Sequence, residues 1–150
     1  MSVTSAQRVN STYDEARVIN RLLIIVGLNA LVLVHILDLP SKLQEAPYLA
    51  VGYLGLISLA ILLMQQLMRR ESPLLFLAAG LLGAGVATAF IVTRTVGLPM
   101  AMDDIGNWTE PLGLASLVID GYLVVQAVLA LMSARNHDSF GRTRSAITNR

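Results

Sequence analysis

Three ionisable residues, His35, Arg94 and Asp120, lie within or at the ends of long apolar stretches of the sequence. A charged side chain at the centre of a membrane helix costs about 2.5–3.5 kcal/mol on insertion scales, so such residues usually face the bundle interior and have a partner. A histidine beside carboxylates can also titrate near neutral pH. These three residues are therefore the first candidates for ion pairing or for binding a polar ligand.

The depth of these residues places them in the same half of a membrane. With a rise of 1.5 Å per residue, Asp120 lies about 13 Å beyond the boundary at Pro111, and His35 and Arg94 each lie about 7 Å from a proline that follows them. We expect Arg94 to meet an acidic group, with Asp120, Glu45 and Glu110 as candidates. The predicted polar cluster consists of six residues: His35, Asp38, Glu45, Arg94, Glu110 and Asp120.

Three interpretations of Arg94 stay open at this stage. Its long side chain can extend to the lipid headgroups, it can form a purely structural ion pair, or it can belong to a functional site. His35 is more often a hydrogen-bonded interior histidine than a metal ligand, and the only other histidine, His137, is in the polar tail. Cysteine is absent, so a haem or zinc site is not expected, whereas carboxylates could complete a site for a hard metal ion. We predict no metal, no cofactor and no catalytic set.

Four apolar runs must position these residues. A membrane-spanning helix needs roughly 20 mostly apolar residues, and the runs predict helices at about 22–39, 48–68, 74–96 and 112–132. The sequence therefore predicts an all-α integral membrane four-helix bundle. Its segments are a cytoplasmic N-terminal segment (1–21), the four-helix domain (22–132) and a cytoplasmic tail (133–150).

Composition argues against the alternatives to a membrane bundle. Hydrophobic residues make up 55% of the chain and charged residues only 14%, well below the roughly 25% typical of soluble domains. The runs are apolar nearly all round, unlike the helices of a soluble bundle. The first run follows some 21 polar residues and lacks a convincing cleavage site, so we expect an uncleaved helix and not a signal peptide. The net charge of +1 argues against a nucleic-acid partner.

Basic residues are distributed unevenly among the segments that join the runs. One side of the predicted membrane carries nine of them and the other side only Lys42 and Arg94. The positive-inside rule then puts both termini in the cytoplasm, with 38–47 and 97–111 as outer loops. The nine are Arg8, Arg17, Arg21, Arg69, Arg70, Arg135, Arg142, Arg144 and Arg150.

Small residues share helix faces with the ionisable ones. Gly80, Gly83 and Ala87 fall on one stripe with Arg94, and Gly113 and Ser116 fall on one stripe with Asp120. Because small residues let membrane helices approach closely, these stripes predict packing faces. Pro40 is expected to end the first membrane helix, and the sequence Thr12–Glu15 resembles a capping box at a helix start.

Four short motifs resemble those of small, uncharacterised four-helix membrane proteins of actinobacteria and related bacteria. The motifs are "VHILDLP", "EAPYLAVGYL", "TRTVGLP" and "WTEPLGLASLVIDGYL", within residues 34–122. Thr93 and Asp120 stand where that pattern has serine and glutamate. The resemblance brings no activity; it implies an actinobacterial plasma membrane and the same polar cluster.

Two functions from different classes fit these features. The first is a non-catalytic accessory subunit of a larger membrane complex, in contact with lipid and with other membrane subunits or a second copy of itself. The second is a small-molecule or ion binding or transport protein that uses the polar cluster. We expect the subunit role in preference to the binding role, and an enzyme is the least expected.

Overall fold

The computed structural model describes the backbone of residues 3–148 and the side chains of residues 15–135. The described chain is all-α, as predicted. Four long helices follow one another: α1 (Val3–Glu45), α2 (Pro47–Arg69), α3 (Pro73–Thr95) and α4 (Pro111–Thr148). A short 3₁₀ helix, η1 (Met102–Asp104), lies in the connection between α3 and α4.

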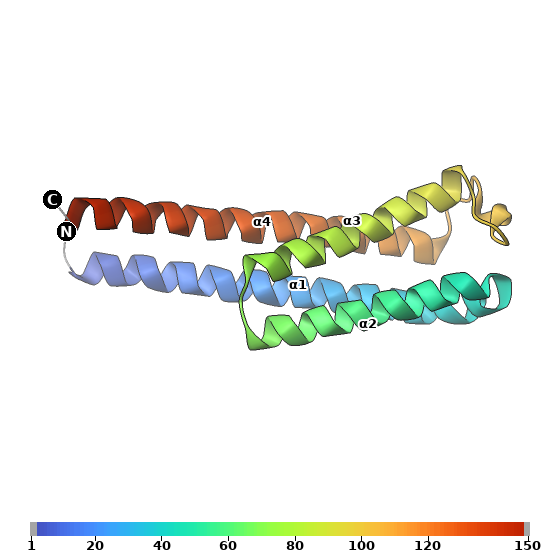
Figure 1. Cartoon of the computed structure of the whole chain (residues 1–150), viewed down its shortest axis with the longest axis horizontal. Helices are drawn as coiled ribbons and strands as arrows, with labels where there is room; N and C mark the ends of the chain where they lie inside the picture. Colours follow the sequence, from blue (N-terminus) through green and yellow to red (C-terminus); the bar gives the residue numbers. More distant parts are fainter. Residues whose placement is uncertain (1–2, 149–150) are drawn as a thin grey trace.

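Successive helices alternate in direction, which gives the bundle two distinct ends (Figure 1). The start of α1 and the end of α4 lie together at one end of the bundle, which we call the terminal end. Both helices extend there beyond the α2–α3 connection. The turn from α1 to α2 and the α3–α4 loop, residues 96–110, lie at the opposite end, which we call the loop end.

Each helix contains a segment long and apolar enough to cross a membrane. These segments are Glu15–Glu45, Pro47–Arg69, Pro73–Thr95 and Pro111–Arg135. Large apolar side chains cover their outer surfaces; Val51 on α2 is 69% exposed and Val118 on α4 is 72% exposed. Lipid is the environment in which such a surface is stable, and the chain is a multi-pass membrane protein with four candidate spans.

The first helix is longer at the loop end than the sequence suggested. Pro40 was expected to end it near residue 39, but α1 continues to Glu45 with Pro40 inside it. Proline removes one backbone hydrogen bond, yet an irregular loop within a membrane would leave more polar groups unpaired. Only Ala46 then separates α1 from α2, so the predicted outer loop at 38–47 is mostly helical.

The other helix bounds agree with prediction except toward the termini. α2 and α3 begin and end within one residue of the expected positions. α1 already begins at Val3, so the capping box predicted at Thr12 does not start the helix. α4 continues through the segment expected to be a separate tail, as far as Thr148.

Apolar and polar interiors occupy different halves of the bundle. The apolar core lies toward the terminal end, where Leu28, Leu67, Phe76 and Leu123 are buried together. Toward the loop end the buried side chains include polar and charged ones, among them His35, Lys42 and Arg94. α3 packs extensively on α4, and α1 packs on both α2 and α4, whereas α2 and α3 make few contacts. The seam between α2 and α3 is thus the least packed part of the bundle.

Glycines allow the close packing of α3 on α4. A Cβ on Gly80 would lie 2.6 Å from Cβ of Ala127, and one on Gly83 would lie 2.9 Å from the backbone oxygen of Asp120. On α4, a Cβ on Gly113 would lie 2.5 Å from the Phe90 ring. Of the other two residues predicted on these faces, Ser116 is buried and Ala87 is half-buried.

Replacing Gly83 should therefore separate α3 from α4. The added methyl group of Gly83→Ala meets a backbone atom, which cannot move aside as a side chain can, so we expect a loss of about 1–3 kcal/mol in unfolding free energy. The matched control is Gly85→Ala, because beyond the neighbouring residues and backbone of its own helix no described atom lies within 4 Å of its added Cβ. Unfolding in detergent micelles measures both; equal stability of the two variants would contradict this packing.

Candidate functional site

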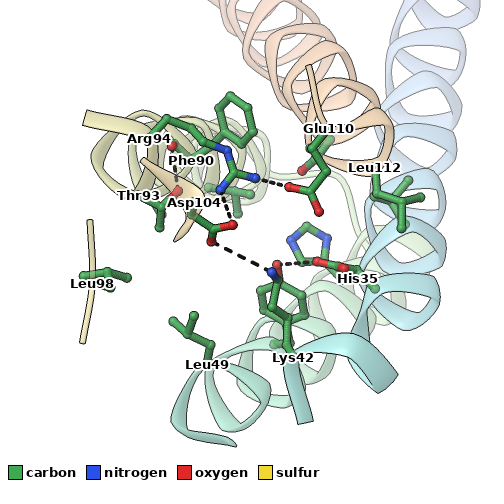
Figure 2. Close-up of a pocket in the computed structure, with 17 residues that line it drawn as sticks. His35, Lys42, Leu49, Phe90, Thr93, Arg94, Leu98, Asp104, Glu110 and Leu112 are labelled. Carbon is green, nitrogen blue, oxygen red and sulfur yellow. Dashed lines mark hydrogen bonds and ion pairs between the residues drawn. The ribbon is translucent and has the colours of Figure 1, made fainter. Parts of the chain in front are cut away.

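Five charged side chains of alternating sign form a chain of ion pairs at the loop end. Figure 2 shows four of them, Lys42, Asp104, Arg94 and Glu110. Nζ of Lys42 lies 3.1 Å from the Glu45 carboxylate and 3.9 Å from the Asp104 carboxylate. The Arg94 guanidinium lies 2.8 Å from Asp104 through Nη1 and hydrogen-bonds Glu110 through Nη2. We call this set the charge chain, in the order Glu45, Lys42, Asp104, Arg94 and Glu110.

The charge chain links elements that are distant in the sequence. Its members come from α1, η1, α3 and the residue just before α4. The Lys42 and Arg94 side chains are only 6% and 4% exposed, so their attraction to the carboxylates is screened much less than at a protein surface. Arg94 also lies over the Phe90 ring, 5.0 Å from its centroid. Because Arg94 is buried, the interpretation that it extends to the lipid headgroups is wrong.

The α3–α4 loop folds back to bring Asp104 to the two cations. Gly97 and Gly106 both adopt φ of +77°, which favours glycine, and a Cβ on Gly97 would lie 2.7 Å from the Ile105 side chain. The Gly106 amide donates to the Arg94 carbonyl over 2.9 Å, and Tyr48 of α2 donates to the Pro99 carbonyl over 2.6 Å. The loop is thereby attached to α3 and α2.

A cavity of about 130 Å³ lies beside the charge chain and reaches between all four helices. Lys42, Asp104, Arg94 and Glu110 are part of its wall. The remaining polar wall is supplied by His35 and Asp38 of α1, Tyr53 of α2, Thr93 of α3 and Ser116 of α4.

His35 and Asp38 are buried in this wall, with 5% and 8% of their surface exposed. The Tyr53 hydroxyl donates to Oδ2 of Asp38 over 2.8 Å. Nδ1 of His35 lies 2.9 Å from the Leu31 carbonyl, which can only accept, so Nδ1 carries a proton. The Tyr53 and His35 rings meet edge to face at 4.8 Å. Tyr53 thus orients both α1 residues.

Asp120 lies deeper than the charge chain and is completely buried. Ser116 donates to its Oδ2 over 3.2 Å, and its Oδ1 has no hydrogen-bond partner among the described residues. Asp120 is therefore not the partner of Arg94, a correction to one of the three candidates. The reason is distance along α4: Asp120 is one turn, about 6 Å, below Ser116, and aspartate is short.

The structure brings most of the predicted cluster together but rearranges its pairs. Of the three candidates, Glu110 is the partner of Arg94, whereas Glu45 pairs with Lys42. His35 and Asp38 lie in the cavity wall without joining the charge chain. Sequence reasoning missed three members of the site: Lys42, Asp104 and Tyr53.

Of the three missed residues, only Lys42 has a local signal in the sequence. Lys42 lies three residues before Glu45 and four after Asp38, the spacings of neighbours on one helix face. This spacing indicates a shared helix face only if the helix continues past Pro40, where the prediction ends it. The position of Asp104 depends on how the α3–α4 loop folds. The position of Tyr53 depends on which face of α2 packs against α1. Neither arrangement has a local sequence signature.

The described residues do not form a metal site. Between residues 15 and 135, no group of three His, Asp or Glu side chains is placed to hold a metal ion. The carboxylates of the charge chain are directed at Lys42 and Arg94 instead.

Removing the cation from the middle of the charge chain should destabilise the loop end. Arg94→Met leaves Glu110 without its ion-pair partner and Asp104 with Lys42 alone. We expect a loss of about 3 kcal/mol in unfolding free energy, as for other broken buried pairs. Adding Glu110→Gln to Arg94→Met should cost less than Glu110→Gln alone, because the pair is already broken. Unfolding of the four proteins in detergent gives this coupling, with exposed Arg69→Met as control. Strictly additive effects would contradict the pairing.

Comparison with known proteins adds no family to this description: the chain matches no protein-family model, no curated protein and no solved structure. The four long apolar helices are consistent with a small four-helix membrane protein, and the resemblance to the actinobacterial proteins stays a prediction.

Proposed function

We propose that the protein binds a small polar solute at the loop end of its bundle, as a membrane-embedded solute-binding or transport protein. The observation that carries this proposal is the cavity, whose wall contains buried or half-buried polar side chains from every long helix. Charges inside a membrane bundle are costly and are found mainly where a membrane protein handles polar solutes. A bundle that needed only stability would be served by the apolar packing found at the terminal end.

The proposed role is binding without catalysis. Ser116 and His35 both line the cavity, but Ser116 donates to Asp120 and Nδ1 of His35 donates to a backbone carbonyl. A nucleophilic serine requires a base to accept its proton and a carboxylate to orient that base. The hydrogen bonds of these residues are directed elsewhere.

A second candidate, the accessory subunit expected from the sequence, has support from α2. Gly52 and Gly55 are exposed on that helix, and no described atom outside it lies within 4 Å of a Cβ built on either. Exposed glycines one turn apart suit close packing against a helix of another membrane protein or of a second copy. The cavity is the more specific feature, so we place solute binding first and the subunit role second.

We further propose that both termini are cytoplasmic in a plasma membrane, so that the cavity is near the outer side. This orientation rests on the nine basic residues of the terminal side. Exposed Arg69, Arg70 and Arg135 belong to this set.

Native mass spectrometry of protein extracted in mild detergent separates the two candidate functions. We expect a particle of one or a few copies that retains a small molecule. Thr93→Phe, which puts a ring into the half-buried part of the cavity wall, should abolish that retained mass, whereas Ile91→Phe, at an exposed position of α3 outside the wall, should not. Stoichiometric co-purification of other chains, with no small mass, would favour the subunit role. Equal retention by both variants would contradict binding in this cavity.

Cysteine labelling tests the orientation, because the chain has no cysteine of its own. A membrane-impermeant maleimide added to intact cells should label Asn107→Cys in the exposed α3–α4 loop. Arg70→Cys, exposed at the α2–α3 connection, should be labelled only after the cells are lysed. The reverse pattern would invert the proposed orientation.

A further inference from the structure

The cavity wall has an excess of negative charge. It contains two cations, Lys42 and Arg94, and three carboxylates, Asp38, Asp104 and Glu110. Both cations are engaged in the charge chain, where Lys42 lies between Glu45 and Asp104 and Arg94 lies between Asp104 and Glu110. With His35 neutral, the wall therefore has a formal charge of −1.

Asp38 is the one carboxylate of the wall that lies outside the charge chain. Between residues 15 and 135, no cationic nitrogen lies within ion-pair distance of its carboxylate, and its hydrogen bond comes from the neutral Tyr53 hydroxyl. Lys42 follows one turn later on α1 but is directed at Glu45 and Asp104. A buried carboxylate without a cation is costly, and a cation in the cavity would remove that cost.

His35 adds a second acceptor to the same wall. Its Nδ1 donates to the Leu31 carbonyl, so Nε2 of the neutral ring presents a lone pair, and no described residue donates to it. His35 comes one turn before Asp38 on the same helix and is only 5% exposed. A further acceptor lies below the cavity. Ser116 donates to Oδ2 of Asp120, and Oδ1 of Asp120 has no hydrogen-bond partner among the described residues.

The volume and the kinds of atoms in the wall limit what the cation can be. A cavity of about 130 Å³ corresponds to roughly four water molecules by their share of liquid volume. Drug-sized ligands, with pockets of about 300 Å³ or more, do not fit. Because the described residues form no metal-binding group, the acceptors suit a ligand that carries its own N–H donors.

We propose that the solute is ammonium or a short primary alkylammonium ion, which donates hydrogen bonds to the Asp38 carboxylate and to Nε2 of His35. The proposal rests on the proposed function and specifies its ligand. The charge chain keeps Lys42 and Arg94 away from Asp38, so that its negative charge stays available to the ligand.

Isothermal titration calorimetry of the purified protein in lipid nanodiscs tests this ligand class. The probe is methylammonium chloride, and the references at equal ionic strength are tetramethylammonium chloride, which has the same charge but no N–H group, potassium chloride and sodium acetate. We expect saturable binding of methylammonium alone, with ammonium chloride as a competitor.

The variants locate the binding. Asp38→Asn should weaken methylammonium binding by about tenfold or more, because a buried charge partner is lost. Asp103→Asn is the matched control, since it makes the same change at an exposed neighbour of the charge chain. His35→Phe keeps a ring against Tyr53 but removes the acceptor; it should also weaken binding about tenfold, and it replaces Asp38→Asn if that variant does not fold.

Each other outcome overturns a defined part of the proposal. Equal binding of tetramethylammonium would contradict the requirement for N–H donors on the ligand. Binding of acetate instead of methylammonium would contradict a cationic ligand, and the proposed solute-binding function would stand. If native mass spectrometry finds a retained solute but no ammonium probe binds, the ligand class is wrong and the proposed function stands. If the folded protein retains no solute and binds no probe, both are wrong.

Discussion

Arg94 contacts two carboxylates from different segments at once, and the loop end depends on this arrangement. Asp104 reaches it through the folded α3–α4 loop, and Glu110 through the residue that precedes α4. A guanidinium suits this task because its planar fork offers several donors in fixed directions. Lys42 extends the same network to α1. Without Arg94 the loop would have no ionic attachment to α3, and the cavity wall would contain three carboxylates and one cation.

The apolar packing that stabilises the bundle and the polar groups of its interior lie in different halves along its length. Toward the terminal end, apolar side chains and close α3–α4 contacts at glycine stabilise the helices. Toward the loop end, the interior contains charges, a cavity and the lightly packed seam between α2 and α3. A polar site inside lipid needs a rigid support, because small shifts alter the alignment of its hydrogen bonds. The apolar half provides that support, and Val86 connects it to the cavity wall.

How much of this was predictable depends on the range of the interaction. The four helices follow from apolar runs of membrane-spanning length, and the need of Arg94 for an acid follows from the cost of a charge in lipid. Choosing Glu110 over Asp120 required the registry of α3 against α4. The prediction misses Lys42 because it rests on the local rule that proline ends a helix. In the membrane this rule does not hold at Pro40, which lies inside α1. Asp104 and Tyr53 come from chain folding that no short stretch of sequence encodes.

The single-residue turn at Ala46 makes α1 and α2 one helical hairpin, and α3 and α4 form a second. This division bears on how the chain is assembled during synthesis. In the first hairpin, Lys42 already has Glu45 three residues away. In the second, Arg94 has Asp104 and Glu110 within 16 residues. Each hairpin thus carries neutralising partners for its own cation as it enters the bilayer. The ionic contact of Lys42 with Asp104, which joins the two halves, forms only after both have been made.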